Sequence, residues 1–309
     1  MNWKDAYDVQ VRQWAWQRSD IGRRALARWA NLECYKQPTK WKVFEQLIPA
    51  EDRKLLFGNP VYVEDTMCDL IEHASTTWAN EPFVTEDVIV PTAFIYFARS
   101  FYILDRRDKP CSVQAVSMTP MHSEEDGEVA GMAVTFYSAI GATGDSEMVA
   151  FAADAERRGL ATPPLIVLHM SPVWFGVDPK EEMTDVDNPG LRTGAEEWWR
   201  LLQVTLRLMS QTVAVREHHH PDRHTRRRGE RLGFDPRDVV VVKLRRPRHA
   251  PTESEHDVEW THRWIVSGHW RNHWFPKEGL HRQIWIGAYV KGPDDAPLVV
   301  KRRAYEWTR

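Results

Sequence analysis

The sequence predicts an α+β fold, with a helical and mixed-sheet N-terminal domain and a small, Trp-rich antiparallel β module at the C-terminus. Three observations predict this class. Apolar side chains in residues 1–50 recur three and four positions apart, as in amphipathic helices. From about residue 83, short apolar or alternating runs lie between Pro, Gly and Asp, which is typical of strands. Residues 260–291 alternate Trp, Ile and Val with polar residues, which indicates further strands.

The N-terminal half is expected to begin with helices and to continue with strands. We expect helical structure within residues 1–50 and a second helix over residues 64–78, whose acidic start suits a helix N-terminus. Five runs then predict strands because they are apolar, β-branched or alternating. They start at Val88, Ala93, Ser112, Gly131 and Pro164.

The clearest helix start is the capping box Thr193-Gly-Ala-Glu196, in which the two outer side chains satisfy each other's free backbone amides. Apolar residues keep helical spacing to about Val215, so we expect a core helix that packs the Trp198-Trp199 pair. Further along, residues 239–248 open with a β-branched run that predicts a strand, and residues 297–307 predict a closing strand.

Charge is distributed unevenly along the chain. Residues 1–200 hold 20 Lys and Arg against 31 Asp and Glu, whereas residues 201–309 hold 21 against 13. We interpret the most basic stretch as a linker. The predicted organisation is an α+β domain over residues 1–217, a His- and Arg-rich linker over 218–238 and the β module over 239–309. A local basic surface attracts phosphate even though the whole chain has a net charge of −3.

Cysteine usage and hydropathy predict a cytoplasmic protein. Cys34, Cys68 and Cys111 lie far apart without a CxxC spacing, which favours reduced thiols over a disulfide framework. The first residues lack the apolar run of a secretion signal, and no 18 consecutive apolar residues occur. We therefore expect no membrane partner.

The His-rich segment after the core helix has two interpretations. His220 and His224 have the spacing that places two metal ligands on one helical face, but Pro221 argues against a helix that spans both. No nearby Cys completes a tetrahedral set. We therefore expect exposed histidines, no metal and no cofactor.

The basic region supplies the candidate nucleic-acid-binding residues. A guanidinium fork matches phosphate oxygens, and an indole ring stacks on bases. The phosphate candidates are Arg226, Arg227, Arg228, Arg271 and Arg282, and the stacking candidates are Trp270 and Trp274. We therefore expect a protein that binds RNA or DNA through a basic, aromatic C-terminal region.

A ribonuclease that needs no metal is an alternative. His269 and His281 would act as its general acid and general base, and neighbouring arginines would stabilise the phosphate. Against this stands a structural role, in which the histidines bond backbone groups and the arginines stack on indoles. Spacing alone does not show whether these side chains converge.

The C-terminal motifs Gly268-His-Trp-Arg271, His281-Arg-Gln-Ile-Trp-Ile286 and Ala288-Tyr-Val-Lys-Gly-Pro293 resemble the ending of uncharacterised proteins from actinobacteria and their phages or mobile elements. The likeness covers about the last fifty residues and extends weakly into residues 240–246. It implies a mobile-element setting and a shared C-terminal module, without catalytic residues. For phage proteins it also implies a third hypothesis, a protein that binds and inhibits a host factor through the acidic surface of residues 51–200.

Overall fold

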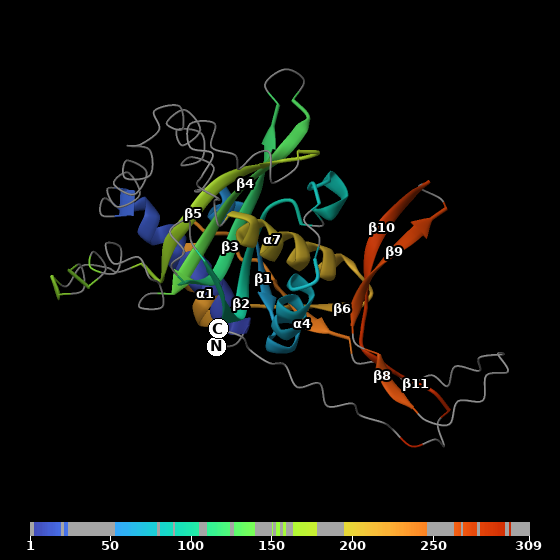
Figure 1. Cartoon of the computed structure of the whole chain (residues 1–309). Coiled ribbons are helices and arrows are strands. Elements are labelled where there is room, and N and C mark those ends of the chain that lie inside the picture. Colours follow the sequence, from blue (N-terminus) through green and yellow to red (C-terminus); the bar gives the residue numbers. More distant parts are fainter. Residues whose placement is uncertain are drawn as a thin grey trace.

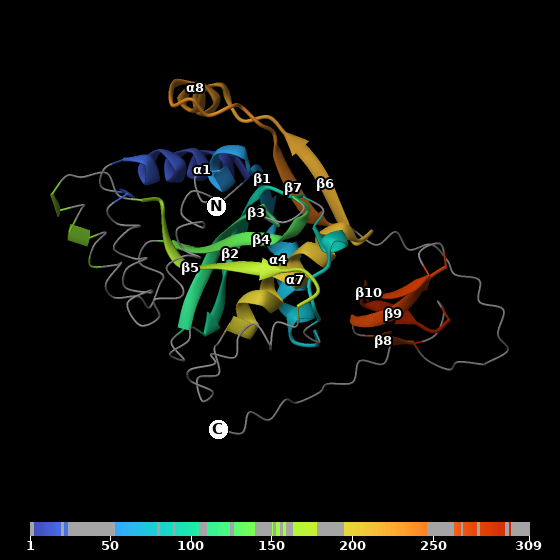
Figure 2. The same cartoon turned by 90° about the horizontal axis from the view of Figure 1, so that it is seen from above.

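A mixed sheet with helices on both faces forms the body of the protein (Figures 1 and 2). Its described strands run in the order β5-β4-β3-β2-β1-β7-β6. In this computed structural model the described residues are 3–19, 22–23, 53–78, 81–88, 90–104, 110–123, 127–139, 150, 153–154, 157–158, 163–177, 195–245, 263–266, 268–276, 279–293 and 297.

The body comprises, in chain order, α1 (Trp3–Arg18), β1 (Asn59–Val63), α4 (Asp65–Ser75), the 3₁₀ helix η1 (Thr85–Asp87), β2 (Ala93–Leu104), β3 (Pro110–His122), β4 (Val129–Ala139), β5 (Leu165–Trp174), α7 (Ala195–Ser210), β6 (Ala214–His219), α8 (Arg223–Arg231) and β7 (Val239–Leu244). Two antiparallel pairs follow: β8 (Trp264–Val266) with β11 (Tyr289–Lys291), and β9 (His269–Phe275) with β10 (Leu280–Ile286). This arrangement confirms the predicted α+β class, with a mixed sheet and a small antiparallel β unit near the C-terminus.

Strand β1 lies inside the sheet and runs parallel to both of its neighbours, β2 and β7. The chain passes from β1 through α4 to β2, which is the crossover that parallel neighbours require. Strands β2 to β5 then form an antiparallel meander, and β6 pairs antiparallel with β7. The predicted strands at residues 93, 112, 131, 164 and 239 are therefore confirmed to within two residues at their starts.

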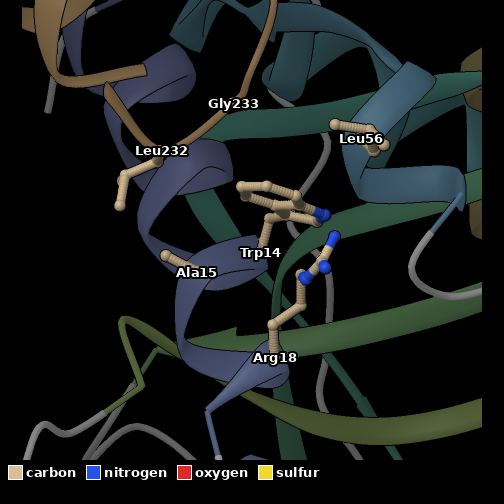
Figure 3. Close-up of a pocket in the computed structure, with 6 residues that line it drawn as sticks. All are labelled: Trp14, Ala15, Arg18, Leu56, Leu232 and Gly233. Carbon is tan, nitrogen blue, oxygen red and sulfur yellow. The ribbon is translucent and has the colours of Figure 1, made fainter. Parts of the chain in front are cut away.

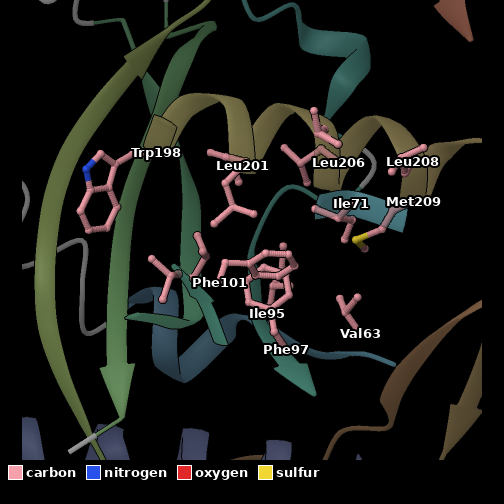
Figure 4. Close-up of a cluster of buried hydrophobic side chains, with 14 of the residues drawn as sticks. Val63, Ile71, Ile95, Phe97, Phe101, Trp198, Leu201, Leu206, Leu208 and Met209 are labelled. Atoms are coloured by element: carbon pink, nitrogen blue, oxygen red, sulfur yellow. The ribbon is translucent and has the colours of Figure 1, made fainter. Parts of the chain in front are cut away.

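The sheet buries both of its faces, because successive side chains of a strand point to opposite sides. Val61 and Val63 of β1 belong to the core under α4 and α7, whereas Tyr62 between them belongs to the core under α1. Figure 4 shows the first of these cores, where leucines of α7 meet side chains of the sheet and of α4. The second core is closed by α1 and Phe234, which follows α8.

The interpretation of residues 218–238 as a linker is wrong. These residues contain the end of β6, all of α8 and the turn that leads into β7. Strand β7 then pairs with β1, for example Val240 with Val61, so the sheet continues across the predicted boundary at residue 239. The β-branched run forms β7 because its side chains are buried in the large sheet. The basic segment connects β6 to β7, two neighbouring strands of that sheet.

Two predicted elements differ from the structure in extent. Val88, Val90 and Pro91 are not in a strand, since the amide of Val88 bonds to Thr85 in the turn of η1. The core helix α7 ends at Ser210 instead of Val215, and backbone bonds through Gln211 turn the chain into β6. After Ser210 the pairing of β6 with β7 outweighs the helical propensity of the sequence.

Several expectations concern residues outside the described ranges. They include Cys34, the Thr193 cap, most of the predicted helical region after residue 23, and residues 298–307 of the closing strand. Among the described helices, α1 and α4 confirm helical structure in residues 1–50 and 64–78. No helix in the described part of the chain has the length and apolarity to cross a membrane.

Candidate nucleic-acid interface

The β9–β10 hairpin has two chemically different faces. Directly opposed residues of an antiparallel pair point to the same face, and the register pairs Trp270 with Trp285 and His273 with Arg282. The inner face, which contacts the body, carries Trp270, Asn272, Trp274, His281, Gln283 and Trp285. The outer face carries His269, Arg271, His273, Phe275, Leu280, Arg282, Ile284 and Ile286.

Tryptophans of the inner face anchor the hairpin to the body. The ring of Trp270 lies 4.6 Å from that of Trp78 and 5.2 Å from that of Trp285. Its Nε1 donates to the carbonyl of Ala74 at the end of α4, at 3.2 Å. The backbone amide of Trp285 donates to Oε1 of Gln211 at 2.7 Å. These contacts join the hairpin to α4 and to the end of α7.

A polar network continues the anchor, and its members Arg207 and Asp87 are buried. Nε2 of Gln283 donates to Oε1 of Glu81 at 2.6 Å, and Oε2 of Glu81 accepts from Nη1 of Arg207 at 3.1 Å. Arg207 also engages Asp87, with Nε 2.8 Å from Oδ1 and Nη2 3.1 Å from Oδ2. The guanidinium lies over the ring of Trp78 at 4.9 Å. The side chains of Gln283, Glu81 and Arg207 thus link the inner face of the hairpin to the core helix α7.

The outer face gathers nitrogen-bearing side chains. Arg271 is exposed, and its Nη2 donates to Nδ1 of His273 at 3.2 Å. Arg282 is the cross-strand partner of His273, so both arginines are neighbours of His273 on the same face of the hairpin. Residues 268–276 and 279–293 contain no Asp or Glu. This face therefore groups two arginines and two histidines, and the described residues of the hairpin contribute no carboxylate to it.

The arginines of α8 lie elsewhere. Figure 2 shows α8 beside α1, on the opposite side of the body from the hairpin. Arg228 pairs with Asp8 of α1, and Arg226 lies 3.8 Å from Glu230 within α8. Arg227 is exposed. The predicted phosphate-binding residues therefore form two separate groups, of which the one on α8 is partly engaged in holding that helix to α1.

Local packing explains why the basic segment folds into a helix. Asp222 precedes α8, and its carboxylate accepts the amide of Thr225 at 2.9 Å. This hydrogen bond lowers the pKa of Asp222, as a bond to the charged form requires. Gly229 faces Tyr7 so closely that a Cβ would lie 2.6 Å from its hydroxyl. The helix α8 therefore packs closely against α1 at Gly229.

The two candidate catalytic histidines are not brought together. His269 is opposite Ile286 at the base of the hairpin and points to the outer face. His281 is opposite Trp274 near the turn and points to the inner face, with the two rings 4.8 Å apart. Five residue steps separate the two positions along the ribbon, about 17 Å at the rise of a strand. One substrate phosphate does not meet both imidazoles in this arrangement.

The two candidate stacking residues also differ from expectation. Trp270 is partly buried between Trp78 and Trp285, so its ring packs against protein. Trp274 is 45% exposed, but it shares the inner face with His281 and not the face of Arg271. The alternation of side chains along β9 therefore separates the indoles from the arginine that they were expected to accompany.

The His-rich segment lies along the edge of the sheet. Nε2 of His219 lies 3.2 Å from Glu217, and His220 contacts Asp238. Glu217 also accepts from Lys243 at 2.8 Å, and this bond raises the pKa of the lysine. Within the described ranges, no three His, Cys, Asp or Glu side chains gather as a metal site would require.

A separate pocket of about 430 Å³ lies between α1, the helical residues 53–57 and the turn after α8 (Figure 3). The guanidinium of Arg18 lies 5.0 Å from the ring centroid of Trp14, whose buried Nε1 has no acceptor in the described structure. None of the predicted site residues lines this pocket. Its walls are Trp14, Ala15, Arg18, Leu56, Leu232 and Gly233.

Sequence reasoning missed the anchor beneath the hairpin. Glu81 and Arg207 are 126 residues apart, so no local pattern joins them. One signal was present, because Gln203 and Arg207 interrupt the apolar face of α7 and both are buried. A buried polar residue in a core helix indicates a partner contributed by another segment.

Comparisons with known proteins add no identification. No protein-family model matches the chain, and no curated protein matches it. The geometry of the hairpin therefore carries the functional argument.

Proposed function

We propose that the protein binds nucleic acid through the outer face of the β9–β10 hairpin. The observation that carries this proposal is the grouping of Arg271, His273 and Arg282 on a face whose described residues include no carboxylate. Arginine pairs with phosphate and with base edges through the same fork of N–H donors. A polyanion is the partner that such a surface fits.

The fixed position of the hairpin on the body supports the same function. Trp270, Gln283 and Trp285 fix the inner face to the body, so the hairpin does not need to be ordered when it binds. A rigid recognition element loses less conformational entropy on association than a flexible one. The anchor therefore favours affinity at the opposite face.

A binding titration with matched variants tests the proposal. Fluorescence anisotropy of labelled oligonucleotides would compare the full chain with the double variant Arg271→Gln/Arg282→Gln. The control is Arg226→Gln/Arg227→Gln on α8, which removes the same charge at a distant place. We expect the hairpin variant to lose affinity by about tenfold or more, and affinity to fall steeply with salt.

The opposite ranking would contradict the proposal. If the α8 variant weakens binding and the hairpin variant does not, the interface lies on the far side of the body. Thermal melting followed by circular dichroism checks that both variants retain the fold, since all four substituted side chains are at least partly exposed.

A further inference from the structure

The form of nucleic acid that suits this hairpin follows from its dimensions. Strands β9 and β10 each contain seven residues, which span about 23 Å at the rise of an antiparallel strand. The major groove of B-form DNA is about 12 Å wide and admits a two-stranded β ribbon. The major groove of A-form RNA is deep and too narrow for side-chain readout. A projecting ribbon therefore fits duplex DNA better than duplex RNA.

The arrangement of aromatic rings on the hairpin favours a duplex over a single-stranded partner. Proteins that bind single strands stack bases on aromatic side chains beside the cations that hold the backbone. On this hairpin, Trp274 lies on the inner face, opposite to Arg271. The outer face has one aromatic carbocycle, Phe275 of β9, whose ring meets that of His273 edge-on at 5.0 Å. The outer face thus offers N–H donors without an open stacking platform.

The donors of the outer face suit the edges of base pairs. Guanine presents two acceptors, N7 and O6, in the major groove, and arginine is their commonest partner. The Nη2 of Arg271 is held by Nδ1 of His273, which restricts the orientation of the guanidinium. Arg282 lies across from His273 on the neighbouring strand. Arg271 and Arg282 are therefore diagonal neighbours on one face of the ribbon.

We infer that the outer face of the β9–β10 hairpin enters the major groove of duplex DNA, with Arg271 at guanine edges. This inference rests on the proposed nucleic-acid binding and narrows it to one partner. The inner-face anchor to α4 and α7 then sets the angle at which the ribbon meets the duplex.

Three probes of one sequence test the choice of partner: duplex DNA, single-stranded DNA and duplex RNA, each titrated with the full chain at fixed salt. We expect duplex DNA to bind about tenfold or more tightly than the other two. Trp274→Ala should leave duplex affinity within about twofold, whereas Arg271→Gln should reduce it about tenfold. Equal or tighter binding of either other probe, or an equal loss in both variants, overturns the inference while nucleic-acid binding stands.

A modified duplex tests the groove. Replacing guanine by 7-deazaguanine removes the N7 acceptor and keeps base pairing, so the loss should be on the order of tenfold. Unchanged affinity for the modified duplex overturns the placement of Arg271 in the major groove. Absence of binding to all probes overturns the proposed function itself, and the inference with it.

Discussion

The ion pair between Arg207 and Asp87 gives the sharpest test of the anchor beneath the hairpin. Both side chains are only 10% exposed, and two nitrogens of the guanidinium face the two carboxylate oxygens. Arg207→Met keeps much of the packing on Trp78 but leaves the carboxylate of Asp87 buried without its cation. Breaking a buried pair from one side costs about 3–5 kcal/mol, and partial exposure places this case near 3 kcal/mol.

Thermal unfolding followed by circular dichroism measures the effect. For a body of this size, about 3 kcal/mol corresponds to a fall in Tm of about 6–12 °C. Adding Asp87→Asn to Arg207→Met should restore part of the loss, because the buried charge is then removed. Arg207→Met should also speed amide exchange in the hairpin. Glu81 then loses its ion pair with Arg207, and this pair fixes the carboxylate that accepts the hydrogen bond from Gln283.

A matched control lies on the surface of the same protein. Arg99 contacts three carboxylates, Asp65, Asp69 and Glu72, whose side chains are 62–70% exposed. Exposed pairs contribute about 0–1 kcal/mol, so Arg99→Met should lower Tm far less than Arg207→Met. A loss below about 1 kcal/mol for Arg207→Met, or a larger loss for Arg99→Met, would show that burial does not decide how much these ion pairs stabilise the protein.

Three further predictions concern the body. Gly229→Ala should destabilise the protein by about 1–3 kcal/mol in urea unfolding, although alanine favours helices, because the new Cβ meets the buried hydroxyl of Tyr7; a gain in stability would contradict this. Burial raises the pKa of Cys68 to about 11, so iodoacetamide at neutral pH should modify this thiol only after unfolding, as peptide mass spectrometry would show. Burial also raises the pKa of Tyr7, Tyr62 and Tyr96 to about 12, so stability should fall as pH rises from about 10 towards 12, where the unfolded chain releases these protons first; a flat denaturation midpoint over this range would count against it.

Local patterns in the sequence predict the elements of the body but not their neighbours in space. The runs at Ala93, Ser112 and Gly131 are short and apolar or alternating, which identifies strands, and the spacing around Trp198 identifies the core helix α7. The place of β7 between β1 and β6 depends on a pairing of Val240 with Val61, 179 positions apart. No periodicity within either segment contains that information.

The same limit explains the errors at the candidate site. Arg228 and Arg271 are both cationic in the sequence, but the fold pairs Arg228 with Asp8 and leaves Arg271 beside His273 on an exposed face. Alternation along β9 implied that Trp270 and Arg271 point to opposite faces, and this could have been read from neighbouring positions. Which face meets the body depends on Trp78, which lies far away in the chain.

Hydrogen–deuterium exchange in the presence of a saturating DNA duplex shows which surface the nucleic acid covers, because it compares the hairpin and α8 within one molecule. We expect slower exchange at residues 269–275 and 280–286 and unchanged exchange at residues 223–231. Protection confined to residues 223–231, with the hairpin unaffected, would place the interface on α8 and not on the hairpin.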